Sequence, residues 1–267
     1  MKWVELLPML IKIGRLSPVL LLGLSVVYGL IRLNALGRTV RIALGLLGLA
    51  LLMTGHVWGL FFAPPEFMMG DVGRILYAHV PTAWVSLVLY LAALIAAVLT
   101  LWNGKPYWES WIVGAVEVGL VLNTLLCFQG AMWAKPTWGV YWDWDPRLTT
   151  TAILIALFGG VLILRSLVHA PDKRRMVTGV SAIIAFVNVP IVYYATTWWN
   201  SLHQGFSSPD TVSNPMHWPL RISAFGVLFL AMAFAGERAR QERDKLEHED
   251  GAPSLPQDLE KISLEGA

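Results

Sequence analysis

The sequence predicts an all-α membrane protein, built as a bundle of about six transmembrane helices. The chain has 267 residues, of which 56% are hydrophobic and 14% are charged. So few polar side chains cannot cover a water-soluble globule of this size. Apolar runs recur along the chain, and lysine and arginine gather in alternate connections between these runs. We therefore interpret the chain as one membrane domain with an extension at each end.

Six apolar runs reach the length of about 20 residues that a transmembrane helix requires. We place them at residues 40–62, 75–102, 110–133, 148–167, 177–198 and 219–236. A shorter stretch at 18–33 is interrupted by glycine, so we interpret it as interfacial or re-entrant. The chain then divides into an N-terminal extension at 1–39, a membrane domain at 40–236 and a charged tail at 237–267. We expect the tail to be solvated and partly disordered.

The distribution of lysine and arginine predicts which end of the bundle faces the cytoplasm. If both termini are cytoplasmic, only four of the 20 Lys and Arg lie on the outer side: Arg74, Lys135, Arg147 and Arg221. Positive charge concentrates in the cytoplasmic connections of membrane proteins, so we expect cytoplasmic N and C termini. Three loops then face outward, at residues 63–74, 135–147 and 199–218.

Several motifs of soluble enzymes do not occur in the sequence. It has no P-loop, no HExxH pair and no GxSxG elbow, so ATP hydrolysis would need another subunit. The single cysteine, Cys127, excludes an intrachain disulfide and a thiolate metal cluster. The N-terminus lacks a cleavage site of small residues, so we expect the first helix to be retained. Membrane lipid is an expected partner, and nucleic acid is not.

Tryptophan is distributed unevenly between the two membrane faces. By our placement, nine of the 13 tryptophans lie at or near the outer side: Trp58, Trp84, Trp133, Trp138, Trp142, Trp144, Trp198, Trp199 and Trp218. An aromatic belt would populate both interfaces. The density is highest in KPTWGVYWDWDPR, between Lys135 and Arg147. So many indole rings form a binding surface for a flat apolar molecule, or they anchor a short loop on the lipid headgroups.

The end of this segment also carries a helix-start signal. Asp145 is a good N-cap residue, and Pro146 is favoured at the first position of a helix. Together they predict the start of the fourth span. The helix start explains Asp145 and Pro146, but it does not explain why Asp143 and the tryptophans occur in this segment.

Two of the six histidines stand out as candidates at the same outer face as this loop. His79, in YAHVP, lies at the outer end of the second span, where Pro81 indicates a break or a helix start. His203, in WWNSLHQG, lies in the last outer loop. Neutral imidazole is a common ligand of haem iron, and two histidines can ligate one iron. Each could instead form a hydrogen bond at the interface, but the shared location favours ligation.

The other four histidines are weaker candidates. His56 and His217 are second-choice ligands, since they are also expected near the outer side. His56 is alternatively a packed polar contact, and His217 a helix entry. His169 and His248 are expected on the cytoplasmic side and in water.

Polar residues inside membrane spans are candidates for function. Glu117 is the clearest case, and two interpretations of it remain open: it meets a cationic partner in the bundle, or it lies in water near the inner surface. Three further residues of this kind are Asn123, Gln129 and Asn188. Pro190 is expected to kink the fifth span.

Three motifs resemble a known family. WGVYWDWDPRLT, from Trp138 to Thr149, resembles the Trp-rich WWD signature of the haem-handling protein family. HVP at 79–81 and WWNSLHQG at 198–205 resemble the segments that carry that family's two outer histidines. The short chain and six spans make the resemblance closest to the CcmC branch, the haem exporter C proteins, over residues 40–236. Pro146 departs from this branch, which usually has a small residue there.

The resemblance implies a role for each matching residue. His79 and His203 would be the axial ligands of haem b iron. The haem-binding surface would comprise Trp133, Trp138, Gly139, Tyr141, Trp142, Asp143, Trp144, Asp145, Arg147 and Trp199.

The resemblance also implies a function. Haem would be bound at the periplasmic face of a bacterial inner membrane and presented to the haem chaperone CcmE, together with CcmA, CcmB and CcmD. The covalent step would occur on the chaperone, so the chain would be a binding and transfer protein and not an enzyme. Two alternatives remain: a b-type cytochrome for membrane electron transfer, and a haem-channel transporter of the system II type with Glu117 on the path.

Overall fold

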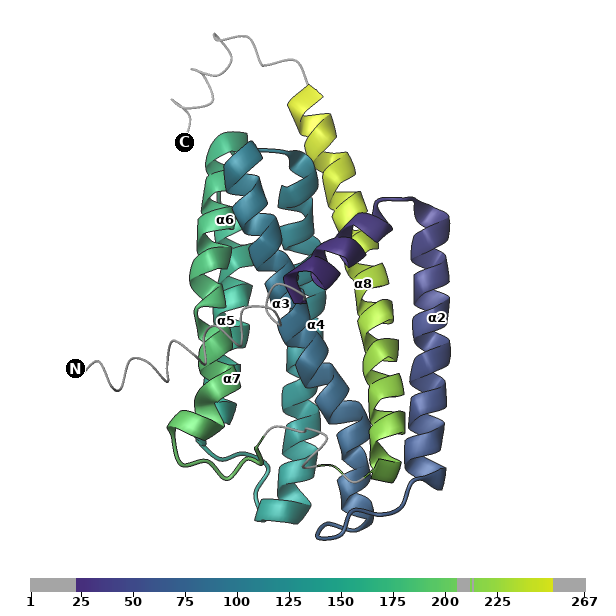
Figure 1. The fold of residues 1–267 in the computed structure, drawn as a ribbon. Coiled ribbons are helices and arrows are strands. Elements are labelled where there is room, and N and C mark those ends of the chain that lie inside the picture. Colours follow the sequence, from purple (N-terminus) through teal and green to yellow (C-terminus); the bar gives the residue numbers. More distant parts are fainter. Residues whose placement is uncertain (1–22, 206–211, 213, 252–267) are drawn as a thin grey trace, which may run out of the picture.

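The computed structural model describes residues 23–205, 212 and 214–251 of the chain (Figure 1). A helix at residues 23–34 precedes the labelled elements. These are α2 (Arg38–Val57), the π-helical turn η1 (Trp58–Phe62), the 3-10 turn η2 (Asp71–Ile75), α3 (Leu76–Asn103), α4 (Pro106–Trp138), α5 (Pro146–Ser166), α6 (Pro171–Phe186), α7 (Asn188–Trp198) and α8 (Asn214–Gly251). In this part of the chain the fold contains helices and loops but no strand, as the sequence predicts.

Six segments are long and apolar enough to cross a membrane, which confirms the predicted number of spans. They are Arg38–Phe62, Asp71–Asn103, Pro106–Trp138, Pro146–Ser166, Pro171–Trp198 and Pro215–Glu249. The helix at 23–34 is not among them. It crosses the bundle obliquely, close to α4 and α8 (Figure 1), and buries Val27 and Ile31.

The last helix is longer than the span predicted at 219–236. α8 continues to Gly251, through the first half of the segment that we expected to be partly disordered. Ion pairs one turn apart support this extension, because Arg240 lies 2.6 Å from Asp244 and Arg243 lies 3.6 Å from Glu247. The rest of the predicted tail, 252–267, lies outside the described residues.

The fifth span is interrupted, as Pro190 predicts. α6 ends at Phe186 and α7 begins at Asn188, with Val187 between them. Proline has no N–H to donate to the carbonyl four residues earlier, which is that of Phe186, so the regular helix cannot continue through this point. Asn188 then braces the break, since its Nδ2 donates to the carbonyl of Thr150 on α5 at 2.8 Å.

Helices α2 and α8 approach closely because glycines face the contact. A Cβ added at Gly48 would lie 2.5 Å from the backbone nitrogen of Leu230, and one at Gly226 would meet the backbone of Leu52. Small residues allow such backbone contact, and van der Waals packing then holds the two helices together in lipid.

Buried ion pairs join the helices at the end where α6 begins and α8 ends. Glu109 of α4 is fully buried. Its carboxylate lies 3.2 Å from Arg165, 3.1 Å from Arg174 and 3.3 Å from Arg175. Three guanidinium groups therefore share one carboxylate that the sequence analysis did not single out.

Glu117 has the cationic partner that one of its two interpretations predicted. Its Oε1 accepts a hydrogen bond of 2.7 Å from Nη2 of Arg238 on α8. The Glu117 side chain is 32% exposed, so the pair is only partly buried. Its evident structural role is to hold α4 against α8.

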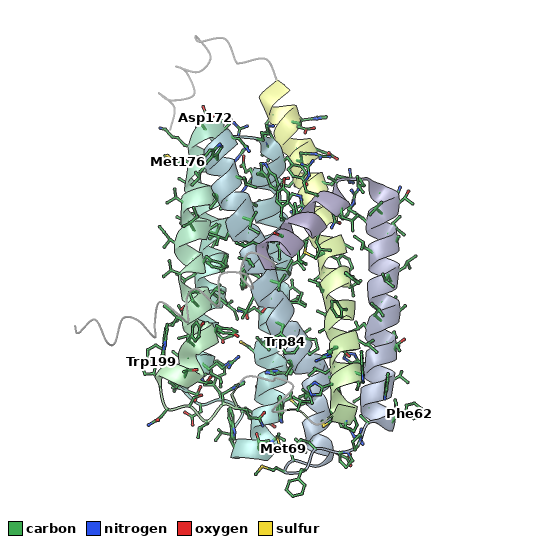
Figure 2. All side chains as sticks on the ribbon, in the orientation of Figure 1. Phe62, Met69, Trp84, Asp172, Met176 and Trp199 are labelled. Atoms are coloured by element: carbon green, nitrogen blue, oxygen red, sulfur yellow. The ribbon has the colours of Figure 1, made fainter. Side chains whose placement is uncertain are left out.

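The described parts of the three loops that were predicted to face outward lie together at the opposite end (Figure 1). Figure 2 shows Met69 and Trp199 near this end and Asp172 at the other. Nε2 of Gln204 lies 3.5 Å from Sδ of Met69, so the first and last of these loops are in contact. The middle loop is shorter than predicted, because α4 includes Lys135 to Trp138.

Candidate functional site

A pocket opens at the loop end, between α3, α4, α5, α7 and the segment 199–205, which we call the His203 loop. We call this cavity the histidine pocket. Its wall contains both candidate iron ligands and several of the predicted aromatic residues. The principal lining side chains are His79, Trp84, Trp133, Trp138, Trp142, Arg147, Tyr193 and His203.

His79 is placed by the early turns of α3. The helix begins at Leu76, close to the predicted start, and accommodates Pro81 shortly afterwards. The imidazole is 8% exposed and meets the ring of Trp133 edge-on, with centroids 5.3 Å apart. Gly130 of α4 leaves room for it, since a Cβ there would lie 3.2 Å from Cε1 of His79.

His203 approaches His79 from a segment far along the chain. The two ring centroids are 6.4 Å apart, with 31° between the ring planes. Because a bond from a metal ion to an imidazole nitrogen is about 2 Å long, two imidazoles that ligate one ion from opposite sides have centroids about 6 Å apart. The observed spacing fits two axial ligands of one iron.

The hydrogen bonding of His203 sets its tautomer. Nδ1 lies 2.8 Å from the carbonyl oxygen of Gln204. A carbonyl only accepts, so Nδ1 carries the proton and, in the neutral ring, Nε2 keeps its lone pair for a metal. Burial and the positive charge of Arg147 lower the pKa of His203, which favours this neutral form.

Two buried nitrogens of the pocket wall have no hydrogen-bond partner among the described residues. They are Nδ1 of His79 and Nε1 of Trp133. Buried polar atoms are nearly always paired in folded proteins. The two nitrogens without a partner therefore indicate that this pocket holds a bound molecule. The flat aromatic side chains of its wall suit a macrocycle such as haem.

The predicted haem-binding surface divides into two groups of residues. Trp133, Trp138, Trp142 and Arg147 line the histidine pocket. The other predicted residues lie outside its wall: Gly139, Tyr141, Asp143, Trp144, Asp145 and Trp199.

The residues outside the wall shape or extend the loop. Gly139 ends α4 in the left-handed conformation, with φ of 80°, which glycine adopts without strain. Tyr141 lies under the ammonium group of Lys135, 5.3 Å from ring centroid to Nζ. Trp144 is exposed and packs edge-on against Trp142, with centroids 5.9 Å apart.

Asp145 is the N-cap of α5, as predicted, and it has a second role. Its Oδ1 accepts from the backbone nitrogen of Arg147 at 2.8 Å. The same carboxylate accepts from Oγ of Ser201 at 2.9 Å and from the backbone nitrogen of Leu202 at 2.7 Å. Burial opposes ionisation of this carboxyl, but the hydrogen bonds outweigh burial and lower its pKa. Asp145 thus fastens the His203 loop to α5.

Other histidines lie away from the pocket wall. Nδ1 of His56 lies 3.0 Å from the carbonyl of Leu52 and 3.4 Å from Oγ of Ser223, so His56 is a polar contact between α2 and α8. His217 is buried in α8 and does not line the pocket. His169 and His248 are exposed, as expected.

Several lining residues were not singled out by the sequence analysis as pocket residues. Trp84 was noted only as an outer tryptophan, Gln204 only as part of a motif, and Tyr193 was not noted. Asn123, noted as an intramembrane polar residue, also lines the pocket and donates to the carbonyl of Thr151 at 3.4 Å. The side of a helix that faces a cavity depends on how the helices pack, and no local motif marks it.

Comparison with known proteins identifies the family. The family model described as "Heme exporter protein C" matches residues 31–251. Heme exporter protein C of Escherichia coli K12 is 36% identical over 202 residues, covering 74% of this chain and 81% of that protein. The Haemophilus influenzae protein of the same name is 38% identical over 201 residues, covering 73% and 81%.

A more distant relative comes from a plant. A putative cytochrome c biosynthesis ccmC-like mitochondrial protein of Marchantia polymorpha is 33% identical over 175 residues, covering 66% of this chain and 73% of its own. With the family model and these bacterial relatives, the six spans and the paired histidines lead to one conclusion. The chain belongs to the haem exporter protein C (CcmC) family.

Proposed function

We propose that this protein binds haem between His79 and His203 and transfers it to another protein during assembly of c-type cytochromes. The observation that carries the proposal is the 6.4 Å separation of the two imidazole rings in a pocket walled by tryptophan. The names of its relatives, haem exporter and cytochrome c biosynthesis protein, support the same role.

Each part of the pocket has a distinct task in this proposal. His79 and His203 hold the iron of haem b from its two faces. Trp138 and Trp142 cover the macrocycle, and Arg147 is placed to pair with its carboxylate groups. Haem is the cargo here and supplies the iron. The protein binds it, orients it and limits its contact with water.

The proposal includes a direction and partners. The histidine pocket faces the periplasm of a bacterial inner membrane, supported by the small number of Lys and Arg at the loop end. Haem passes to the chaperone CcmE, with CcmA, CcmB and CcmD as further partners. No covalent step on this chain is required, so we assign it transfer and not catalysis.

Haem titration of the purified full chain tests the ligand assignment. Wild-type protein should give the absorption spectrum of six-coordinate, low-spin haem, because both axial positions are filled by imidazole. Each single variant, His79→Ala or His203→Ala, should lose this spectrum, and the double variant should lose specific binding. His56→Ala removes a histidine outside the pocket and serves as the control. A double variant with the wild-type spectrum would refute the assignment.

A release assay separates transfer from electron transport. A transfer protein that is mixed with an excess of a haem-accepting apoprotein should lose its haem to that apoprotein. A b-type cytochrome for electron transfer would retain it through repeated reduction and oxidation. The transporter alternative relied on Glu117, but Glu117 pairs with Arg238 and does not line the histidine pocket.

A further inference from the structure

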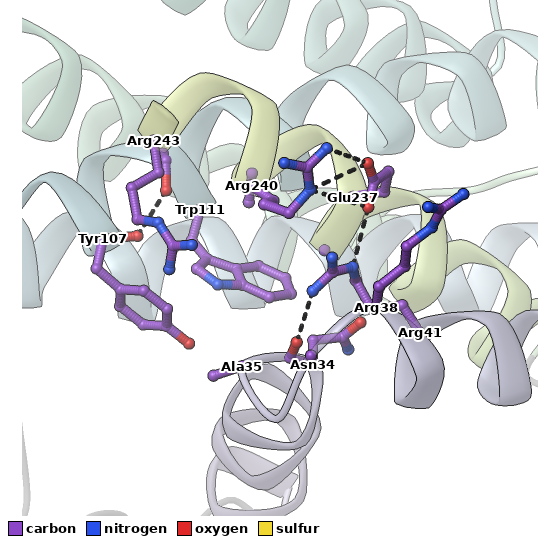
Figure 3. Close-up of a pocket in the computed structure, with 13 residues that line it drawn as sticks. Asn34, Ala35, Arg38, Arg41, Tyr107, Trp111, Glu237, Arg240 and Arg243 are labelled. Carbon is purple, nitrogen blue, oxygen red and sulfur yellow. Dashed lines mark hydrogen bonds and ion pairs between the residues drawn. The ribbon is translucent and has the colours of Figure 1, made fainter. Parts of the chain in front are cut away.

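A second pocket lies at the end of the bundle opposite the histidine pocket. It is bounded by the helix at 23–34, the start of α2, the start of α4 and the charged part of α8 (Figure 3). We call it the arginine pocket. Four arginines and one glutamate are the ionisable residues of its wall, apart from Tyr107: Arg38, Arg41, Arg240, Arg243 and Glu237.

The wall holds one carboxylate for four guanidinium groups, and a second carboxylate, that of Asp244, lies 2.6 Å from Arg240. Glu237 accepts a hydrogen bond of 3.0 Å from Nε of Arg41 and one of 2.8 Å from Nη2 of Arg240 (Figure 3). Arg38 has no carboxylate partner among the described residues. Nε of Arg243 is buried without a hydrogen-bond partner there, and lies 3.6 Å from Glu247. Three of the four arginines therefore have a carboxylate within 4 Å, and the charge of Arg38 is the positive excess among the described residues.

The elements around the arginine pocket place it at the level of lipid headgroups. The candidate spans of α2 and α4 begin at Arg38 and Pro106, so the pocket coincides with their polar ends. Tyr107 and Trp111 line it. Tyrosine and tryptophan are enriched where hydrocarbon meets headgroups.

An apolar track leads from this pocket along α2. Arg38, Ile42, Leu46 and Leu49 follow one another at helical spacing on one side of the helix. The three apolar residues are 50%, 63% and 47% exposed. A molecule with a charged head at Arg38 could lay its hydrocarbon chains along this face.

We propose that the arginine pocket binds the phosphate group of an anionic phospholipid from the adjoining leaflet. Guanidinium groups form strong, charge-assisted hydrogen bonds with phosphate oxygens, and basic pockets between membrane helices suit anionic headgroups. Arg38, which has no carboxylate partner among the described residues, and Arg243, whose buried Nε makes no hydrogen bond there, hold the phosphate, while Arg41 remains engaged with Glu237. The apolar track selects a lipid over a soluble phosphate ion.

Native mass spectrometry of the full-length, delipidated protein tests this site. The probes are phosphatidylglycerol, neutral phosphatidylcholine and inorganic phosphate. Wild-type protein should bind phosphatidylglycerol more tightly than phosphatidylcholine. The double variant Arg38→Gln/Arg243→Gln should weaken phosphatidylglycerol binding by about 5-fold for each arginine removed. Lys105→Gln/Lys173→Gln removes the same charge from exposed residues at the same end and should have no such effect.

Three results would overturn the proposal. Equal losses in the two double variants would mean that general surface charge attracts the lipid. Equal binding of phosphatidylcholine, whose choline cancels the phosphate charge, would mean that the net negative charge of the headgroup plays no role. Displacement of the lipid by inorganic phosphate at the same concentration would assign the pocket to a soluble anion. The single variant Arg38→Gln, which breaks no ion pair among the described residues, gives the same comparison if the double variant folds poorly.

Discussion

The carboxylate of Asp145 accepts a hydrogen bond of 2.9 Å from the hydroxyl of Ser201, although the two residues are 56 positions apart in the chain. Oγ of Ser201 in turn accepts from the backbone nitrogen of His203 at 3.0 Å. The N-cap of α5 is therefore connected through one serine to the proposed iron ligand. The position of His203 depends on a residue of the Trp-rich segment that does not itself line the histidine pocket.

Substitution of Asp145 should disturb the His203 side of the proposed haem site. Asn at 145 loses the charge, and its amide group has only one acceptor oxygen for three donors. Because hydrogen bonds to a charged group contribute about 1.5–3 kcal/mol, Asp145→Asn should weaken haem binding and leave five-coordinate haem held by His79. Absorption spectra during haem titration measure both effects. Asp143→Asn, at an exposed residue of the same loop, is the control, and equal spectra in both variants would argue against the link.

Gly130 should be required for the position of His79. The Cβ of alanine there would lie 3.2 Å from Cε1 of His79, so the imidazole must shift by a few tenths of an ångström. We expect Gly130→Ala to lower haem affinity and alter the low-spin spectrum while the protein stays folded.

Gly159→Ala is the matched control for this substitution. It places the same methyl group in α5, where nothing lies within 4 Å of the added Cβ. In an open helical position alanine stabilises by about 0.5–1 kcal/mol relative to glycine. A spectrum of Gly130→Ala that equals those of wild type and Gly159→Ala would show that the contact has no effect on His79.

His203 should titrate below its ordinary range in the protein without haem. Burial and the charge of Arg147 lower its pKa from the usual value of about 6.5, so the ring is neutral at pH 7. With a lowered folded-state pKa, the stability from neutral His203 is present above about pH 6.5 and is lost as pH falls through the folded pKa. NMR titration of labelled histidine, assigned with His203→Ala, measures this. A midpoint at or above 6.5 would contradict it.

The two glutamates of α4 should differ in their effect on stability. Glu109 is fully buried among three arginines, so Glu109→Gln leaves buried positive charge uncompensated and should destabilise by about 3–5 kcal/mol. Glu117 pairs with Arg238 in a partly exposed site, and Glu117→Gln should cost about 1 kcal/mol or less. Thermal unfolding of the purified variants in one detergent compares them. Similar melting temperatures would mean that burial does not strengthen the Glu109 cluster.

Haem transfer should not depend on Glu117, which lies outside the histidine pocket. If Glu117 only holds α4 against α8, Glu117→Gln should transfer haem at the wild-type rate when haem is supplied to the folded protein. Abolished transfer with unchanged haem binding would restore the transporter hypothesis.

The sequence alone predicted the features that depend on local chemistry. Runs of apolar residues gave the six spans, Asp145 and Pro146 marked the start of α5, and Pro190 marked the break before α7. The WWD-like segment and the two histidines identified the family. The predicted helix boundaries were less accurate where i,i+4 ion pairs continue a helix, as in α8.

The tertiary structure alone decided which distant residues meet. The approach of His79 to His203, the bonds from Ser201 and Leu202 to Asp145, and the burial of Glu109 each join segments that are far apart in the chain. Spans and caps are set by neighbouring residues, because hydrophobic length and backbone hydrogen bonding act over a few turns. Contacts between helices depend on the rotation and tilt of whole helices, which the packing of all six spans fixes together.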